Sequence, residues 1–110
     1  MGILNYAGQQ FEIEDRLLAH LKIVIVQKLR RREAFLLSWP NATSEGGGRN
    51  SLWLSETMPL HFRFHGSRPP KLNRQWIEAM IAATHTMAGL ILGDLIEAEG
   101  PATGAVPVVP

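Results

Sequence analysis

The sequence predicts a small single domain of the α+β class, in which a mostly antiparallel sheet packs on two helices. Two segments carry apolar residues at helical spacing, and six short segments carry either the alternation of a strand or an apolar run between turn residues. The chain has 110 residues, 45% of them hydrophobic, which is enough to build one core. The predicted order is β-β-α-β-β-β-α-β. We expect this domain to cover residues 1–96 and the tail, 97–110, to be disordered, because the tail has neither periodicity nor turn signals.

The first two predicted strands, at residues 2–7 and 10–14, form a hairpin whose turn contains Gly8. A helix follows, and Asp15 is its predicted N-cap. The arginines at 30–32 lie in the last turn, where positive charge suits the negative end of the helix dipole. The capping residues and the length of the periodic segment therefore predict a helix from Asp15 to these arginines.

This first helix has two unusual features. The run 23–26 is β-branched and is also compatible with a strand, although length and capping favour the helix. A second apolar stripe lies beside the main apolar face. Its members are Ala19, Ile23 and Val26. We therefore expect this helix to be covered on a second side, either by another helix of the same chain or by the second subunit of a homodimer.

Three further strands are predicted at residues 34–39, 51–55 and 60–65. Pro40 ends the first of them, because proline cannot donate a hydrogen bond to a neighbouring strand. The second and third should pair as a hairpin whose apolar residues share one face. This register places Trp53 on the outer face, opposite His61 or Arg63; the alternative is that Trp53 is buried beneath a helix.

The last third of the predicted domain begins with a stiff connection. The two prolines at 69–70 hold the chain extended. Asn73 is the predicted N-cap of a helix over 74–88, and Gly89 is its predicted C-terminal cap. A short apolar run at 90–92 predicts the final strand.

Charged residues are segregated along the chain although the net charge is only +1. All eleven lysines and arginines lie between Arg16 and Arg74, together with only three of the ten acids, which gives this segment a net charge of +8 (eleven minus three). Such an asymmetry suggests an anionic partner. The candidate binding residues are Arg30, Arg31, His61, Arg63, Arg68, Lys71 and Arg74, with Trp53 as a stacking partner. The alternative is an ordinary solvated surface.

Patterns that would indicate catalysis or metal binding are missing. Without cysteine the chain can form neither a disulfide nor a thiolate metal site. His61 and His65 would lie about 13 Å apart on a strand, too far to share an ion. The triglycine at 46–48 precedes a strand rather than a helix, which predicts a flexible loop and not a phosphate site. We therefore expect no catalytic residue, no metal and no cofactor.

Three blocks of the chain resemble a known family. They comprise residues 19–25 with 28–31, residues 35–39, and residues 59–64 with 67–78. Together they are similar to small actinobacterial proteins that are commonly labelled ATP-dependent DNA ligase, and the resemblance covers most of residues 1–92. The run Arg-Pro-Pro-x-Leu-Asn-Arg-x-Trp-Ile-Glu at 68–78 is its most specific part.

The ligase label implies a lysine nucleophile in a Lys-x-Asp-Gly motif. The nearest match is Lys71-Leu72-Asn73-Arg74, which lacks both the acid and the glycine. A ligase also needs a nucleotidyltransferase domain, which is longer than this chain. No catalytic residue is therefore carried over from the resemblance.

The sequence supports three hypotheses of function. The first is a non-catalytic, homodimeric binding module whose basic surface contacts nucleic acid or an acidic protein. The second is a structural protein that associates through the second apolar stripe without a nucleic-acid role, and the third is a protein related to DNA ligase. We expect a cytoplasmic location without membrane association, because no targeting segment or long apolar run is recognised.

Overall fold

Six strands and two helices occur in the part of the chain that the computed structural model describes, residues 1–41 and 46–93. In chain order they are β1 (Gly2–Tyr6), β2 (Gln9–Ile13), α1 (Asp15–Arg30), β3 (Phe35–Pro40), β4 (Arg49–Leu54), β5 (Leu60–Arg63), α2 (Arg74–Thr84) and β6 (Leu90–Ile91). The predicted α+β class and element order are confirmed, including a helix through the β-branched run 23–26. The predicted tail, 97–110, lies outside the described residues.

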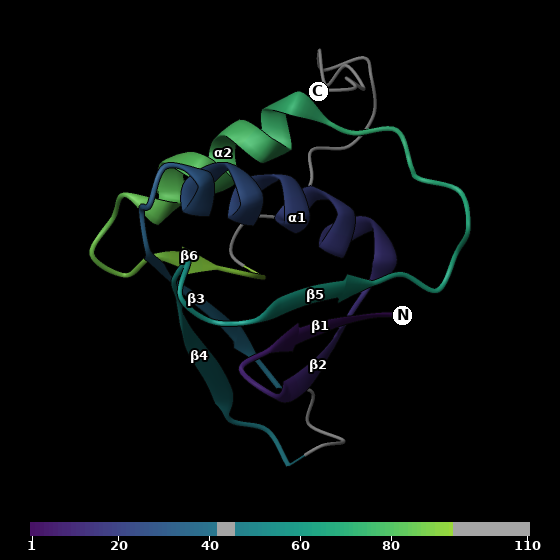
Figure 1. The fold of residues 1–110 in the computed structure, drawn as a ribbon, viewed down its shortest axis with the longest axis horizontal. Coiled ribbons are helices and arrows are strands. Elements are labelled where there is room, and N and C mark those ends of the chain that lie inside the picture. Colours follow the sequence, from purple (N-terminus) through teal and green to yellow (C-terminus); the bar gives the residue numbers. More distant parts are fainter. Residues whose placement is uncertain (42–45, 94–110) are drawn as a thin grey trace.

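The strands form two three-stranded sheets, ordered β2-β1-β5 and β4-β3-β6. All pairs are antiparallel except the parallel pair of β3 and β6. Figure 1 shows α1 and α2 lying together on one side of these sheets. α1 contacts β1, and α2 contacts β3 and β6, so the two helices cover both sheets.

The predicted hairpin between the strands at 51–55 and 60–65 is wrong. β4 pairs with β3, whereas β5 pairs with β1 in the other sheet, so Trp53 does not lie opposite His61 or Arg63. The buried Tyr6 explains this crossover, because its hydroxyl donates to Trp53 O (2.8 Å) and accepts from Ser55 N (3.0 Å). This directs the chain leaving β4 across the end of β1, where Ala7 N donates to the carbonyl of residue 59.

Both helix starts are capped by side chains, but one cap differs from the prediction. Asn73 caps α2 as predicted, its Oδ1 accepting from Trp76 N at 3.3 Å. The N-cap of α1 is Glu14 and not Asp15: the Glu14 carboxylate accepts from Arg16 N at 2.7 Å. The Asp15 carboxylate instead accepts hydrogen bonds from the backbone of residues 65 and 66.

α2 is shorter than predicted and ends at Thr84, with His85 as its C-cap. Gly89 therefore does not cap the helix. It lies at the turn into β6 with φ of +76°, and a Cβ there would come within 2.5 Å of Leu36 O. Close approach of the backbone to β3, and not helix termination, explains the need for glycine at this position.

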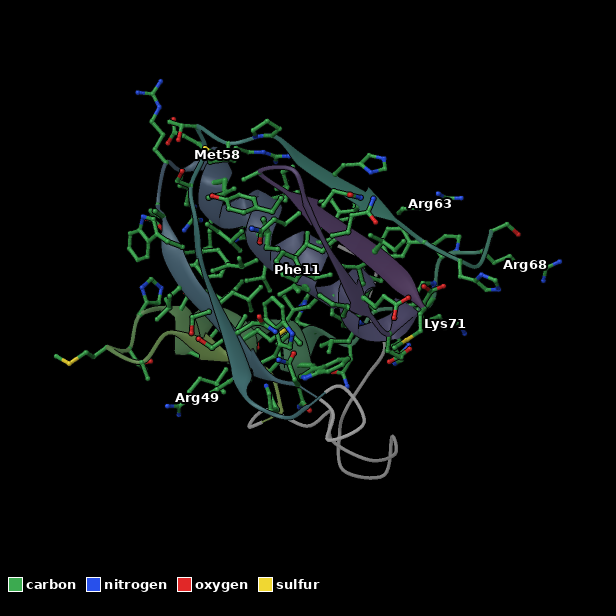
Figure 2. All side chains as sticks on the ribbon, turned by 90° about the horizontal axis from the view of Figure 1, so that it is seen from below. Phe11, Arg49, Met58, Arg63, Arg68 and Lys71 are labelled. Atoms are coloured by element: carbon green, nitrogen blue, oxygen red, sulfur yellow. The ribbon has the colours of Figure 1, made fainter. Side chains whose placement is uncertain are left out.

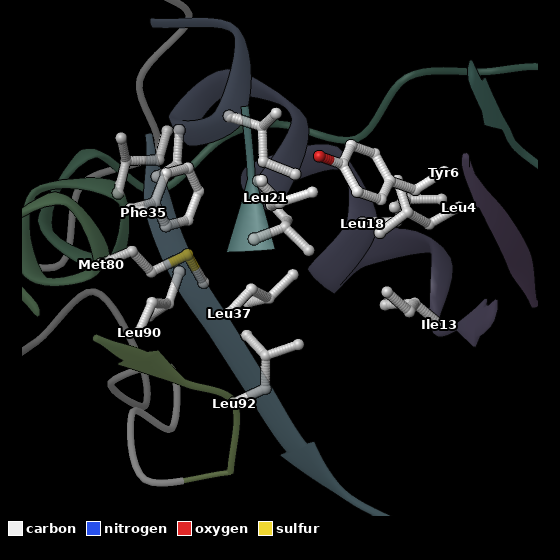
Figure 3. Packing of buried hydrophobic residues seen from close by; sticks show 14 of the residues in the cluster. Leu4, Tyr6, Ile13, Leu18, Leu21, Phe35, Leu37, Met80, Leu90 and Leu92 are labelled. Carbon is white, nitrogen blue, oxygen red and sulfur yellow. The ribbon is translucent and has the colours of Figure 1, made fainter. Parts of the chain in front are cut away.

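The hydrophobic core runs continuously between the helices and both sheets (Figure 3). Phe35, Leu37, Met80 and Leu90 gather where α2 faces the sheet of β3, and Leu21 of α1 lies beside this group. The main apolar face of α1 thus belongs to the core, as predicted, which leaves its second apolar stripe to be accounted for.

Candidate functional site, a basic groove beside the first helix

The connector between β5 and α2, residues 64–73, is fixed at both ends by side chains of α1. At its start, the Asp15 carboxylate accepts hydrogen bonds from His65 N (3.2 Å) and Gly66 N (2.8 Å). Towards its end, Arg16 Nη1 donates to the carbonyl oxygen of Lys71 (2.9 Å). The connector therefore passes along the N-terminal half of α1, and Figure 1 shows it arcing outward past that end of the helix.

His20 provides the third attachment and is fully buried. Its Nε2 accepts from Asn73 N (2.8 Å), and since an amide can only donate, the ring proton lies on Nδ1, which donates to Arg16 O (2.7 Å). The imidazole also contacts the Trp76 ring, with centroids 4.6 Å apart. His20 is thus a neutral imidazole that joins α1 to the first turn of α2.

A groove of about 600 Å³ lies between α1 and this connector. Its apolar lining comes from Ala19, Ile23, Phe64, Pro69, Pro70 and Leu72. Its charged lining comes from Glu14, Asp15, Arg16, Lys22, Arg68 and Lys71. We call this cavity the basic groove, because its cations outnumber its carboxylates and both carboxylates already accept backbone hydrogen bonds.

Exposed cations surround the basic groove at one side of the molecule. Figure 2 shows Arg63, Arg68 and Lys71 on this side, with Arg49 on the far side. Within residues 1–41 and 46–93, none of these four side chains forms an ion pair; the pairs found there are Lys28–Glu33 and Arg32–Glu56. Arg63, Arg68 and Lys71, which we call the basic end, are therefore available to an anionic ligand.

The ionised form of the Asp15 carboxylate is stabilised by the hydrogen bonds that it accepts from the connector. Hydrogen bonds from Gly66 N, and secondarily from His65 N, lower the pKa of Asp15 below its ordinary value of 3.8. Asp15 therefore stays ionised at neutral pH and holds the connector through charge-assisted hydrogen bonds.

Several predicted binding residues lie away from the basic end. Arg30 and Arg31 are at the C-terminal end of α1, about 24 Å along the axis from its first residue. Trp53 lies on the outer face of β4 and is 63% exposed, so the alternative of burial beneath a helix is wrong. His61 lies on β5 two residues before Arg63. Arg74 begins α2 and is exposed, but it is not part of the groove lining.

The second apolar stripe of α1 has a partner within the same chain. Ala19 and Ile23 form a wall of the basic groove, which the connector covers from the opposite side. Val26 is half-buried and lies outside the groove lining. The predicted cover on a second side is thus supplied in part by the chain's own connector, and association with a second subunit stays a prediction.

Residues 1–95 match the model of a family described as "Domain of unknown function (DUF7882)". The chain belongs to this family. No curated protein and no solved structure matches the chain significantly.

In this DUF7882 domain, sequence patterns did not indicate the roles of Asp15, Arg16, His20 and Lys22. All four lie on α1, but three of them act on residues more than fifty positions away. Lys22 was hidden in the same way: its Nζ lies 5.7 Å from the centroid of the Phe64 ring, a cation–π contact across the groove. Helical spacing places Asp15, Lys22 and Ile23 on neighbouring faces of α1, but it does not show that the connector lies beside them.

Neither helix in the described part of the chain is long and apolar enough to cross a membrane. Residues 1–41 and 46–93 hold no group of three or more side chains suited to a metal ion. The glycines at 46–48 precede β4, where Asn41 N donates to the carbonyl of Gly48 (2.9 Å).

Proposed function

We propose that this protein is a small, non-catalytic binding module that contacts an anionic macromolecule, nucleic acid or an acidic protein, through its basic end and the adjoining basic groove. The observation that carries this proposal is the set of exposed cations without carboxylate partners beside a preformed apolar cavity. Exposed lysines and arginines are common on protein surfaces, so the support for an external ligand comes from the position of these cations beside an apolar cavity.

The hydrogen bonds around the groove favour binding over catalysis. A general base needs a free acceptor, but both His20 nitrogens are engaged in structural hydrogen bonds, and Asp15 holds the connector. Where a ligase would carry its motif acid, this chain has Asn73, whose side chain caps α2. These groups have structural roles, which supports a module that recognises a partner without transforming it.

The proposal is tested by fluorescence anisotropy of labelled oligonucleotides and acidic peptides over a salt series. If all three cations of the basic end contact phosphates of a duplex, log K should fall with log salt with a slope of about −3. Arg68→Ala/Lys71→Ala should weaken binding about tenfold or more and flatten this slope.

Arg31→Ala/Arg49→Ala is the matched control. It removes the same charge from two exposed side chains remote from the groove, Arg31 at the C-terminal end of α1 and Arg49 on the far side of the molecule, and should leave affinity within about twofold. Equal losses in the two double variants would show that only net charge matters. Absence of binding to every anionic probe at low salt would refute the proposal.

A further inference from the structure

We infer that the basic groove receives an acidic polypeptide segment carrying an apolar anchor side chain. This inference rests on the proposed function, because the basic end supplies the attraction for the acidic residues. It adds the class of partner and the part of the partner that enters the cavity.

The walls of the groove select an apolar side chain. Ala19, Ile23 and Leu72 contribute aliphatic surface, and a volume of about 600 Å³ is sufficient for a buried anchor. A nucleic-acid base would instead need an aromatic face for stacking. The one aromatic ring among the described lining residues, Phe64, already has Lys22 Nζ at 5.7 Å from its centroid, so aliphatic contact is the better match.

The charges around the cavity select acidic residues next to that anchor. Arg68 and Lys71 come from the connector and Lys22 comes from α1, so cations flank the groove on both sides. Carboxylates placed before and after an inserted anchor would each find a cation. Such pairing at the rim mainly orients the partner and raises its rate of association.

The two carboxylates at the groove distinguish a polypeptide from a nucleic acid. Glu14 and Asp15 accept backbone hydrogen bonds, and carboxylate oxygens retain capacity for further donors. A polypeptide brings amide N–H groups that can donate to them. A phosphodiester backbone brings mainly acceptor oxygens to this end of the groove, so a polypeptide matches these two carboxylates better.

The groove exists before a partner binds. Asp15, Arg16 and His20 hold the connector at points on either side of Arg68, so little order needs to be gained on association. A preorganised site of this kind gives affinity to a short segment, because fewer side chains and less backbone must be immobilised.

The test compares two labelled peptides with the intact protein: short polyglutamate with two central leucines, and the same peptide with two central serines. The leucine peptide should bind about tenfold more tightly than the serine peptide. Ile23→Ser should abolish this difference without changing the affinity for the serine peptide. Val26→Ser, on the same helix but outside the groove, should preserve it.

The outcomes separate the inference from the proposed function. Equal affinity for both peptides refutes the anchor, and this comparison needs no variant to fold. Oligonucleotides that bind more tightly than either peptide, and depend on Arg68 and Lys71 but not on Ile23, would overturn the inference and leave the proposed function intact. If no anionic probe binds, both fail.

Discussion

His20 is the residue whose replacement should most weaken the link between the two helices. In His20→Ala, the buried Asn73 N–H loses its acceptor, which costs about 1–3 kcal/mol. Loss of the contact with Trp76 adds about 0.5–1.5 kcal/mol, and loss of buried ring surface adds about 1 kcal/mol. The expected destabilisation is therefore about 2.5–5.5 kcal/mol, a large share of the 5–15 kcal/mol typical of a domain.

His20→Phe separates the hydrogen bond from the packing. Phenylalanine keeps an aromatic ring against Trp76 but offers no acceptor to Asn73 N, so only the cost of the orphaned amide, about 1–3 kcal/mol, should remain. Urea unfolding followed by circular dichroism should show a midpoint lower by about 1 M.

His85→Ala serves as the control for this series, since His85 is exposed at the end of α2. It should change the free energy of unfolding by no more than about 0.5 kcal/mol. The reasoning is wrong if His20→Phe is also within about 0.5 kcal/mol of the unmodified protein, because Asn73 N would then not depend on the imidazole.

Two further predictions concern acid stability and the turn before β6. Because connector amides lower the pKa of Asp15, its contribution to stability is fully present above the ordinary pKa of 3.8 and is lost as pH falls through the lowered value. Asp15→Asn should therefore make the free energy of unfolding less dependent on pH in this range. An unchanged pH dependence of unfolding would refute this prediction. Gly89→Ala should lower Tm more than Gly47→Ala: both have positive φ, with its usual cost of about 1–2 kcal/mol, but only at Gly89 does the added Cβ meet Leu36. Equal Tm losses in calorimetry would show that the close approach is unimportant.

Local sequence signals determined most of the secondary structure but not the pairing of its strands. Alternation in 60–65 correctly identified a strand, and Asn73 correctly identified a helix start, because both signals depend on neighbouring residues. The partner of β5 depends instead on Tyr6, whose hydroxyl holds the chain after β4 across the end of β1. The strand pairing is therefore set by a side chain nearly fifty residues away, which the local alternation of polar and apolar residues cannot reveal.

The sequence identified several residues of the candidate site, but not that they lie together in the folded chain. Arg68 and Lys71 were recognised by their charge, and Ala19 and Ile23 by their helical spacing. Their common location follows from the path of the connector, which Asp15 fixes across fifty residues. Asp15 itself was assigned to the helix cap, because a carboxylate at a helix start satisfies local rules equally well in either role.

The structure also changes what the charge asymmetry means. The net charge of +8 between Arg16 and Arg74 is spread over the molecule, because Arg30 and Arg31 lie at the C-terminal end of α1 and Arg49 lies on the far side from the basic end. The surface that remains has few cations, and a few phosphate contacts supply only weak, salt-sensitive binding. Charge alone therefore accounts poorly for a specific partner. The apolar groove beside these cations supplies a contribution that salt does not screen, which is why affinity should depend on Ile23 as well as on Arg68.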